Sequence, residues 1–132
     1  MRRQSTRVDL ARPTRSEKLL NEITIRNNPE RLRFEVLDGG TRIGQAAYVD
    51  DGGGHRIFYH TVIDREYGGQ GLAGRLAAQA LDETVAAGLK IVPVCPYIKK
   101  YLGKHTQYAA SIQNPTPALL AVLKALAERA RR

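Results

Sequence analysis

This 132-residue chain contains few of the residues and patterns that define several large classes of protein. Its one cysteine, Cys95, excludes an intramolecular disulfide and a zinc site made of several cysteines, so a cytoplasmic location is expected. No run approaches the roughly 20 apolar residues that span a bilayer, so we expect no membrane partner. The three histidines lack the spacing of metal-binding pairs, and no metal site is expected.

The net charge of +8 is concentrated at the two ends of the sequence. Residues 1–20 hold six Lys or Arg and two acids, residues 118–132 hold four and one, and the remainder is nearly balanced. Basic tails attract nucleic acids or acidic proteins, but charge runs are more commonly solvated. We therefore expect residues 1–20 to be a flexible basic extension of one domain, residues 21–132, without a nucleic-acid partner. The alternative is a nucleic-acid adaptor whose salt-sensitive binding requires residues 1–20.

The hydrophobic pattern predicts a meander of four antiparallel strands in residues 21–64. Apolar and polar residues alternate in "NEITIRN" and "RLRFEVL", as they do in half-buried strands. Asp38-Gly39-Gly40 predicts a tight hairpin before "TRIGQAAYV", because glycine and aspartate accept the backbone angles of such turns. A second glycine-rich turn separates this segment from "HRIFYHTVI".

The second half of the chain predicts three helices and one strand. An apolar stripe predicts a helix over 72–87, and a C-terminal helix is expected over about 116–131. Between them, "LKIVPVC" is expected to be a short buried strand. Pro93 has no N–H for a ladder, so it belongs at an edge or where strands part. "PYIKKYL" then predicts a helix with proline at its first position and Gly103 past its end.

The loop "REYGGQGLAGRL" contains Gly69, Gly71 and Gly74 between a strand and a helix. Glycines let a ligand approach the backbone, and the first N–H groups of a helix favour an anion, so we expect this loop to bind a pyrophosphate. No Lys-Ser or Lys-Thr follows, which excludes a P-loop. A dinucleotide site needs an acid about 20 residues on, but none lies between Glu83 and Glu128, so NAD is not expected.

The segment "YGGQGLAGRL" resembles motif A of the GNAT superfamily of N-acetyltransferases, [Q/R]-x-x-G-x-[G/A]. Gly71 and Ala73 match its last two fixed positions, and Gly68 stands where Arg or Gln is usual, which removes one side-chain contact to phosphate. Together with "YHTVID" and "GLKIVPVCPYIKKYL", the chain from about Ile23 to Tyr108 resembles a small single-domain GNAT subfamily with an active-site cysteine in a C-P-[YF] motif.

The resemblance implies a minimal GNAT fold of the α+β class. Its sheet would be mixed and mostly antiparallel, with flanking helices and with fourth and fifth strands that splay apart around acetyl-CoA, the cosubstrate. The implied cofactor-binding residues come from the fourth strand, the glycine loop and the following short helix: Thr61, Val62, Ile63, Gly69, Gln70, Gly71, Leu72, Ala73, Gly74 and Tyr101.

Three side chains are candidates for catalysis. Cys95 precedes Pro96 at a predicted helix start, where its thiol would act as a base or a transient acetyl acceptor; the alternative is a small buried apolar residue. His60 would deprotonate the amine or Cys95, or form a structural hydrogen bond. Tyr97 would protonate the leaving CoA thiolate, a role equally open to Tyr101, unless both only pack.

The sequence therefore predicts an acetyl-CoA-dependent N-acetyltransferase that acts on a primary amine. In larger members of the superfamily, helices after the first strand enclose the acceptor, whereas here Asn27–Glu30 connects directly to the second strand. An open acceptor side favours a protein or peptide amine, or a small polyamine. The alternative is a non-catalytic acyl-CoA-binding or regulatory module on the same fold.

Overall fold

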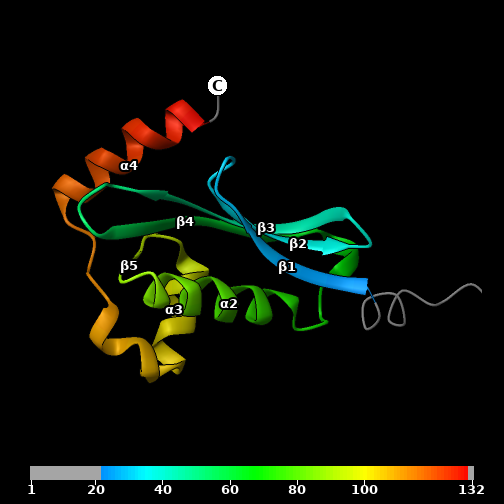
Figure 1. The fold of residues 1–132 in the computed structure, drawn as a ribbon. Helices are drawn as coiled ribbons and strands as arrows, with labels where there is room; N and C mark the ends of the chain where they lie inside the picture. Colours follow the sequence, from blue (N-terminus) through cyan, green and yellow to red (C-terminus); the bar gives the residue numbers. More distant parts are fainter. Residues whose placement is uncertain (1–21, 131–132) are drawn as a thin grey trace, which may run out of the picture.

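The computed structural model describes residues 22–130, so the predicted basic extension, residues 1–20, lies outside the described residues. Four strands come first, then the glycine loop, a long helix, a fifth strand and two more helices (Figure 1). The elements are β1 (Ile23–Asn28), β2 (Arg33–Asp38), β3 (Thr41–Asp50), β4 (His55–Ile63), η2 (Arg65–Tyr67), α2 (Leu72–Ala86), β5 (Lys90–Pro93), α3 (Pro96–Lys104), η3 (Thr106–Ser111) and α4 (Pro117–Ala130).

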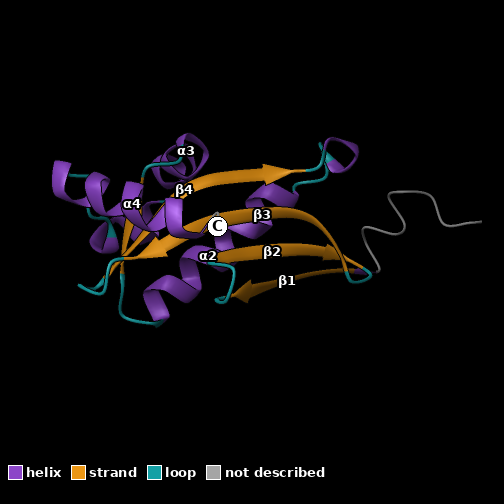
Figure 2. Ribbon diagram, turned by 90° about the horizontal axis from the view of Figure 1, so that it is seen from above, coloured by secondary structure: helices purple, strands orange, loops and turns teal. Residues whose placement is uncertain are grey.

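The five strands form one sheet in the order β1-β2-β3-β4-β5. Strands β1 to β4 pair antiparallel, and β5 pairs parallel to β4. Figure 2 shows the first four strands side by side in sequence order. The predicted hairpin after β2 is confirmed: Gly39 and Gly40 have φ angles of +58° and +95°, in the left-handed region that glycine tolerates. The predicted α+β class and the mixed, mostly antiparallel sheet are likewise confirmed.

Helices cover both faces of the sheet (Figure 1). On one face, which we call the inner face, α2 and α3 pack on a core that includes Phe34, Tyr48 and Phe58. On the opposite, outer face, Leu119 of α4 packs on Val49, Ile57 and Val92, with Leu123 and Leu126 beside it. The Thr116 hydroxyl accepts the Leu119 N–H and so caps the start of α4.

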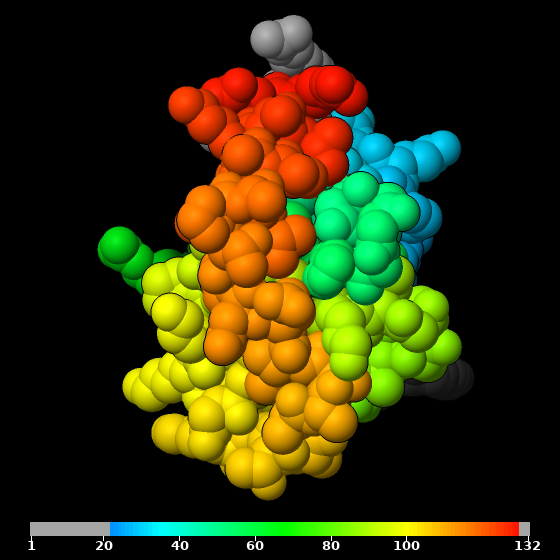
Figure 3. Space-filling model, turned by 90° about the vertical axis from the view of Figure 1, so that its left-hand side faces the viewer, coloured from blue at the N-terminus to red at the C-terminus, as the bar shows by residue number. Residues whose placement is uncertain are grey.

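The chain after α3 crosses the β5 edge of the sheet to reach the outer face. Ile112 forms an isolated parallel bridge with Ile91, and the Gln113 N–H donates to the Ile91 carbonyl at 2.8 Å. Figure 3 shows this segment, in orange and red, running along that side of the molecule. It covers a strand edge that would otherwise offer its backbone to other chains.

Strands β4 and β5 part where Pro93 ends the ladder, as the sequence predicts. Their pairing runs from His55–Lys90 to Phe58–Pro93, and β4 continues to Ile63 without β5. The Phe58 carbonyl accepts the N–H groups of both Val94 and Cys95, at 3.0 and 2.9 Å, which ends the ladder. Within the part of the chain that the structure describes, the second half of β4 therefore has no strand on its β5 side.

Two features of the helices differ from the sequence prediction. Gly103 lies inside α3, which continues to Lys104, because Gly103 does not adopt the positive φ of a C-terminal glycine. The 3-10 helix η3 was not predicted; it places the buried Tyr108 so that its hydroxyl donates to Asp82 of α2 at 2.6 Å. Over residues 22–130, none of the helices combines the length and apolar character needed to cross a membrane.

Candidate active site

The glycine loop leaves the start of α2 open. Gly69 and Gly71 have φ angles of +78° and +76°, which side chains rarely adopt, and a Cβ at either position would meet no atom within 4 Å. Gly71 directly precedes α2, and no side chain of residues 22–130 caps the helix. The first N–H groups of α2 therefore remain available to an anion, whose charge the helix dipole favours.

Two hydrogen bonds hold the segment before the glycines against the sheet. The Asp64 N–H donates to the Ile43 carbonyl of β3 at 2.7 Å, and the Tyr67 hydroxyl donates to Oδ2 of Asp38 at the end of β2. Asp38 is 6% exposed, and its Oδ1 is buried with no hydrogen-bond partner among the described residues. The loop's position thus depends on a buried carboxyl group in another hairpin.

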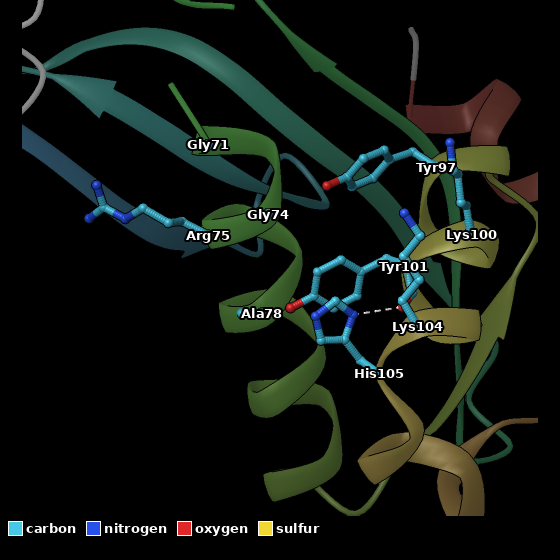
Figure 4. A pocket seen from close by; sticks show the side chains of 9 residues that line it. All are labelled: Gly71, Gly74, Arg75, Ala78, Tyr97, Lys100, Tyr101, Lys104 and His105. Atoms are coloured by element: carbon cyan, nitrogen blue, oxygen red, sulfur yellow. Dashed lines mark hydrogen bonds between the residues drawn. The ribbon is translucent and has the colours of Figure 1, made fainter. Parts of the chain in front are cut away.

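A cavity of about 660 Å³ lies between α2 and α3 (Figure 4). It begins at the start of α2 and is lined by Gly71, Gly74, Arg75, Ala78, Tyr97, Lys100, Tyr101, Lys104 and His105. In Figure 4 the hydroxyls of Tyr97 and Tyr101 point from α3 toward α2. A Cβ built on Gly74 would lie 3.9 Å from the Tyr97 hydroxyl, so this group is close to the first turn of α2.

Both tyrosines keep their protons over a wide pH range. Burial raises the pKa of Tyr97. Burial, with a smaller contribution from Tyr97 and Asp82, raises the pKa of Tyr101. A phenol that stays neutral can donate a hydrogen bond or a proton to a stronger base.

Cys95 lies where the strands part. It directly precedes Pro96 at the first position of α3, and its thiol does not cap the helix. Cys95 is 4% exposed, and its thiol instead donates to the Thr61 hydroxyl of β4, with 3.4 Å between Sγ and Oγ1. The structure thus brings together two predicted site residues from the two diverging strands.

His60 lies on the other face of the sheet. It pairs with Ala47, whereas Thr61 pairs with Ala46, a residue of the inner core that also contains Cys95. Side chains alternate between faces along a strand, so His60 points away from Thr61 and Cys95. It lines an outer-face cavity of about 410 Å³ with Gln45, Ala47 and Tyr59. A direct His60–Cys95 contact, one of the two roles considered for this histidine, is therefore absent.

The side chains of the remaining predicted cofactor-binding residues differ in how far they are exposed. Leu72 is 3% exposed and packs in the inner core, so only its backbone is free for a ligand. Val62 is 41% exposed, and Gln70 is exposed in the loop. Sequence reasoning missed Arg75, Lys100, Lys104 and His105 as cavity-lining residues. The spacing of Tyr97, Tyr101 and His105, four residues apart, was the available signal for the last of them.

A family model described as GCN5-related N-acetyl-transferase matches residues 33–112. The chain belongs to this family. The match spans β2 to the start of the segment after η3, and so includes the glycine loop, Cys95 and the cavity between α2 and α3. Membership gives the protein an acyltransferase-type function, in a family that typically uses acetyl-CoA. A comparison with curated proteins gave no match. In the described part of the chain, no three His, Cys, Asp or Glu side chains lie together as a metal site would require.

Proposed function

We propose that this protein is an acetyl-CoA-dependent N-acetyltransferase that acetylates a primary amine. The observation that carries the proposal is the contact of the Cys95 thiol with Thr61 where β4 and β5 part. The open start of α2 and the neighbouring cavity supply room for the rest of the donor. Acetyl transfer needs a thioester held next to the group that attacks it, and this arrangement supports the proposal that the thioester lies beside Cys95.

The donor would bind through backbone groups at two places. The N–H groups from Gly69 to Gly74 would hold the pyrophosphate, because no described side chain caps the start of α2. The backbone of Thr61, Val62 and Ile63 would pair with the pantetheine amides, because this part of β4 has no β5 partner. Gly68 contributes no side chain to the phosphates, so the backbone cradle carries their binding.

The acyl-transfer chemistry would centre on the Cys95 sulfur. The sulfur attacks the thioester carbonyl, and the thiol proton ends on the departing CoA sulfur, relayed by the Tyr97 hydroxyl. The bond from the acetyl carbon to CoA sulfur breaks as the bond to Cys95 forms. The incoming amine then takes the acetyl group, and one of its protons returns to the Cys95 sulfur. The raised pKa of Tyr97 supports its role, because a neutral phenol can give and regain a proton.

The acceptor amine would approach from the outer face, where His60 would remove its ammonium proton. The cavity that His60 shares with Tyr59 supports this route. Strand β1 joins β2 through residues 29–32 alone, so no helix at this connection encloses the acceptor. We therefore propose a protein or peptide amine, or a small polyamine, as acceptor.

Exchange of isotopically labelled CoA into acetyl-CoA, without an acceptor, tests the covalent step. Wild-type protein should catalyse this exchange and gain the mass of one acetyl group, and Cys95→Ala should do neither. Cys95→Ala should still be stabilised by CoA in thermal unfolding, since CoA binding does not need the thiol. Unchanged exchange by Cys95→Ala would remove the thiol from the mechanism. CoA binding without exchange, and without acetylation of spermidine or a lysine peptide, would leave the alternative acyl-CoA-binding module.

A further inference from the structure

The outer face around His60 has an excess of positive charge that the proposed transfer does not use. Along strands β1 to β4, this face carries three arginines, Arg26, Arg33 and Arg42, and one acid, Glu35. In Figure 2, which looks onto this face, α4 lies over one end of the strands. Removal of the ammonium proton uses His60 but leaves the arginines without a role.

The strand register places Arg33 and His60 in one row across the sheet. Ala47 of β3 pairs with Arg33 of β2 on one side and with His60 of β4 on the other. Residues directly opposite one another point to the same face, and two strand spacings separate the outer two by roughly 10 Å. Ala47 has only a methyl group, so the space between them stays open as part of the 410 Å³ cavity.

Arg33 is held in place with most of its donors unused. Its Nε donates to Oε2 of Glu35 at 2.7 Å, and the Glu35 side chain is 3% exposed. Arg26 and Asn28 donate to the same carboxylate at 3.4 and 3.1 Å. The Nη1 and Nη2 atoms of Arg33 form no hydrogen bond with any residue from 22 to 130. A guanidinium fixed through Nε can present both Nη groups together to a second carboxylate.

Gln45 supplies another free donor beside this guanidinium. Nη1 of Arg42 lies 2.9 Å from Oε1 of Gln45, and a guanidinium can only donate, so the bonded atom is the amide oxygen. Nε2 of Gln45 then remains a donor, without a partner among the described residues. Gln45 lies directly opposite Glu35, which holds Arg33, and it lines the cavity with His60. The cavity lining contains no Asp or Glu.

We propose that Arg33 and Gln45 bind a carboxylate of the acceptor while His60 takes the proton from its amine. The inference rests on the proposed function and names the class of acceptor. An extended peptide advances about 3.3–3.6 Å per residue, so the roughly 10 Å between Arg33 and His60 corresponds to about three residues. The acceptor is therefore a peptide segment with Asp or Glu about three residues from the reacting amine. A polyamine would bring further positive charge to the arginines, and like charges repel.

Acetylation of three capped peptides by the full chain tests this assignment. Each peptide has a single lysine, with Glu, Gln or Arg at the third position on both sides of it. Wild-type protein should have a kcat/KM about tenfold higher for the Glu peptide than for the Gln peptide, because a charged partner strengthens the bonds from Arg33 and Gln45. The Arg peptide and spermidine should be the poorest acceptors.

Three variants assign the preference to named residues. Arg33→Gln should remove the difference between the Glu and Gln peptides, mainly by raising KM for the Glu peptide, because the contact is made before transfer as well as during it. Gln45→Leu should reduce the difference while leaving the Arg33–Glu35 pair intact, and so tests the site even if Arg33→Gln does not fold. Arg26→Gln is the matched control: it removes a donor to the same carboxylate, but one strand farther from His60. It should keep the preference.

The outcomes separate this inference from the function on which it rests. Exchange of labelled CoA into acetyl-CoA needs no acceptor, so it reports on the proposed function alone. Exchange with equal kcat/KM for the Glu and Gln peptides, with spermidine as the better acceptor, or with no peptide acetylated, would overturn the inference and leave the covalent step standing. A preference that survives both Arg33→Gln and Gln45→Leu, or that Arg26→Gln removes equally, would overturn it too. If neither exchange nor acetylation occurs, the proposed function fails together with the inference.

Discussion

Replacing Tyr67 by phenylalanine should weaken both the fold and the binding of CoA. The substitution removes the hydroxyl that donates to Oδ2 of Asp38, a residue that is 6% exposed. The other oxygen of this carboxyl group, Oδ1, already has no hydrogen-bond partner among the described residues. Hydrogen bonds to charged groups contribute about 1.5–3 kcal/mol, so we expect a loss of about 2 kcal/mol in the free energy of unfolding. For a domain of this size, the unfolding midpoint should fall by roughly 6–10 °C.

The effect on CoA follows from the position of Tyr67, which directly precedes the glycine loop. Without the bond to Asp38, the binding of CoA must order loop backbone that the wild-type protein already holds in place. Ordering the backbone costs about 1–2 kcal/mol per residue. We therefore expect CoA affinity to fall about tenfold, which corresponds to about 1.4 kcal/mol.

Tyr48→Phe is the matched control for this prediction. It removes another tyrosine hydrogen bond, 2.8 Å to Asn27, from a side chain that is 1% exposed and lies away from the loop. It should destabilise the fold by about 1 kcal/mol and leave CoA affinity unchanged. Calorimetric titration with CoA compares the affinities of the two variants, and thermal unfolding compares their stabilities. Equal CoA affinities for the two variants would refute the argument that the Asp38 contact positions the loop.

Two further predictions concern backbone conformation and pH. Gly71→Ala should lower the free energy of unfolding by about 1–2 kcal/mol and weaken CoA binding, because Gly71 has a φ of +76°. Gly103→Ala, inside α3, should instead raise the free energy of unfolding by up to about 1 kcal/mol. Chemical denaturation compares the two variants, and equal effects would contradict the reasoning. Burial raises the pKa of Glu35, but hydrogen bonds from Arg33 and Asn28 and the nearby positive charge outweigh it, and the pKa is lowered from 4.5. Its contribution to stability should therefore be present above pH 4.5 and be lost as the pH falls through the lowered pKa, and Glu35→Gln should flatten that acid limb in pH-dependent unfolding.

Much of the fold follows from local signals in the sequence. Alternation in β1 and β2, the Asp38-Gly39-Gly40 turn and the proline in β5 each act over a few residues, and each predicts what the structure contains. The helix end at Gly103 was predicted wrongly because a glycine stops a helix only when its backbone turns left-handed. That choice depends on the contacts of the following segment, where the His105 N–H bonds to the Leu102 carbonyl and η3 begins.

The cavity was less predictable than the loop at its edge. A glycine loop can be recognised from seven consecutive residues. A cavity between two helices depends on how α2 and α3 pack, and the apolar pattern of either helix alone does not determine that packing. Lys100 and Lys104 look like ordinary solvated residues in "PYIKKYLGKH". Only the position of α2 gives these lysines a shared cavity with Gly71 and Gly74.

The placement of His60 has a single physical cause. With strict alternation in "HRIFYHTVI", His60 would share a face with Phe58, which belongs to the same inner core as Cys95. The register shift opposite Ala47 and Tyr48 leaves Tyr59 as an extra residue in β4. Beyond it the faces exchange, so Thr61 and not His60 reaches Cys95. Successive side chains alternate in any case, so the one inserted residue decides which of the two reaches which face: it makes Thr61 the partner of the thiol, while His60 faces the proposed acceptor.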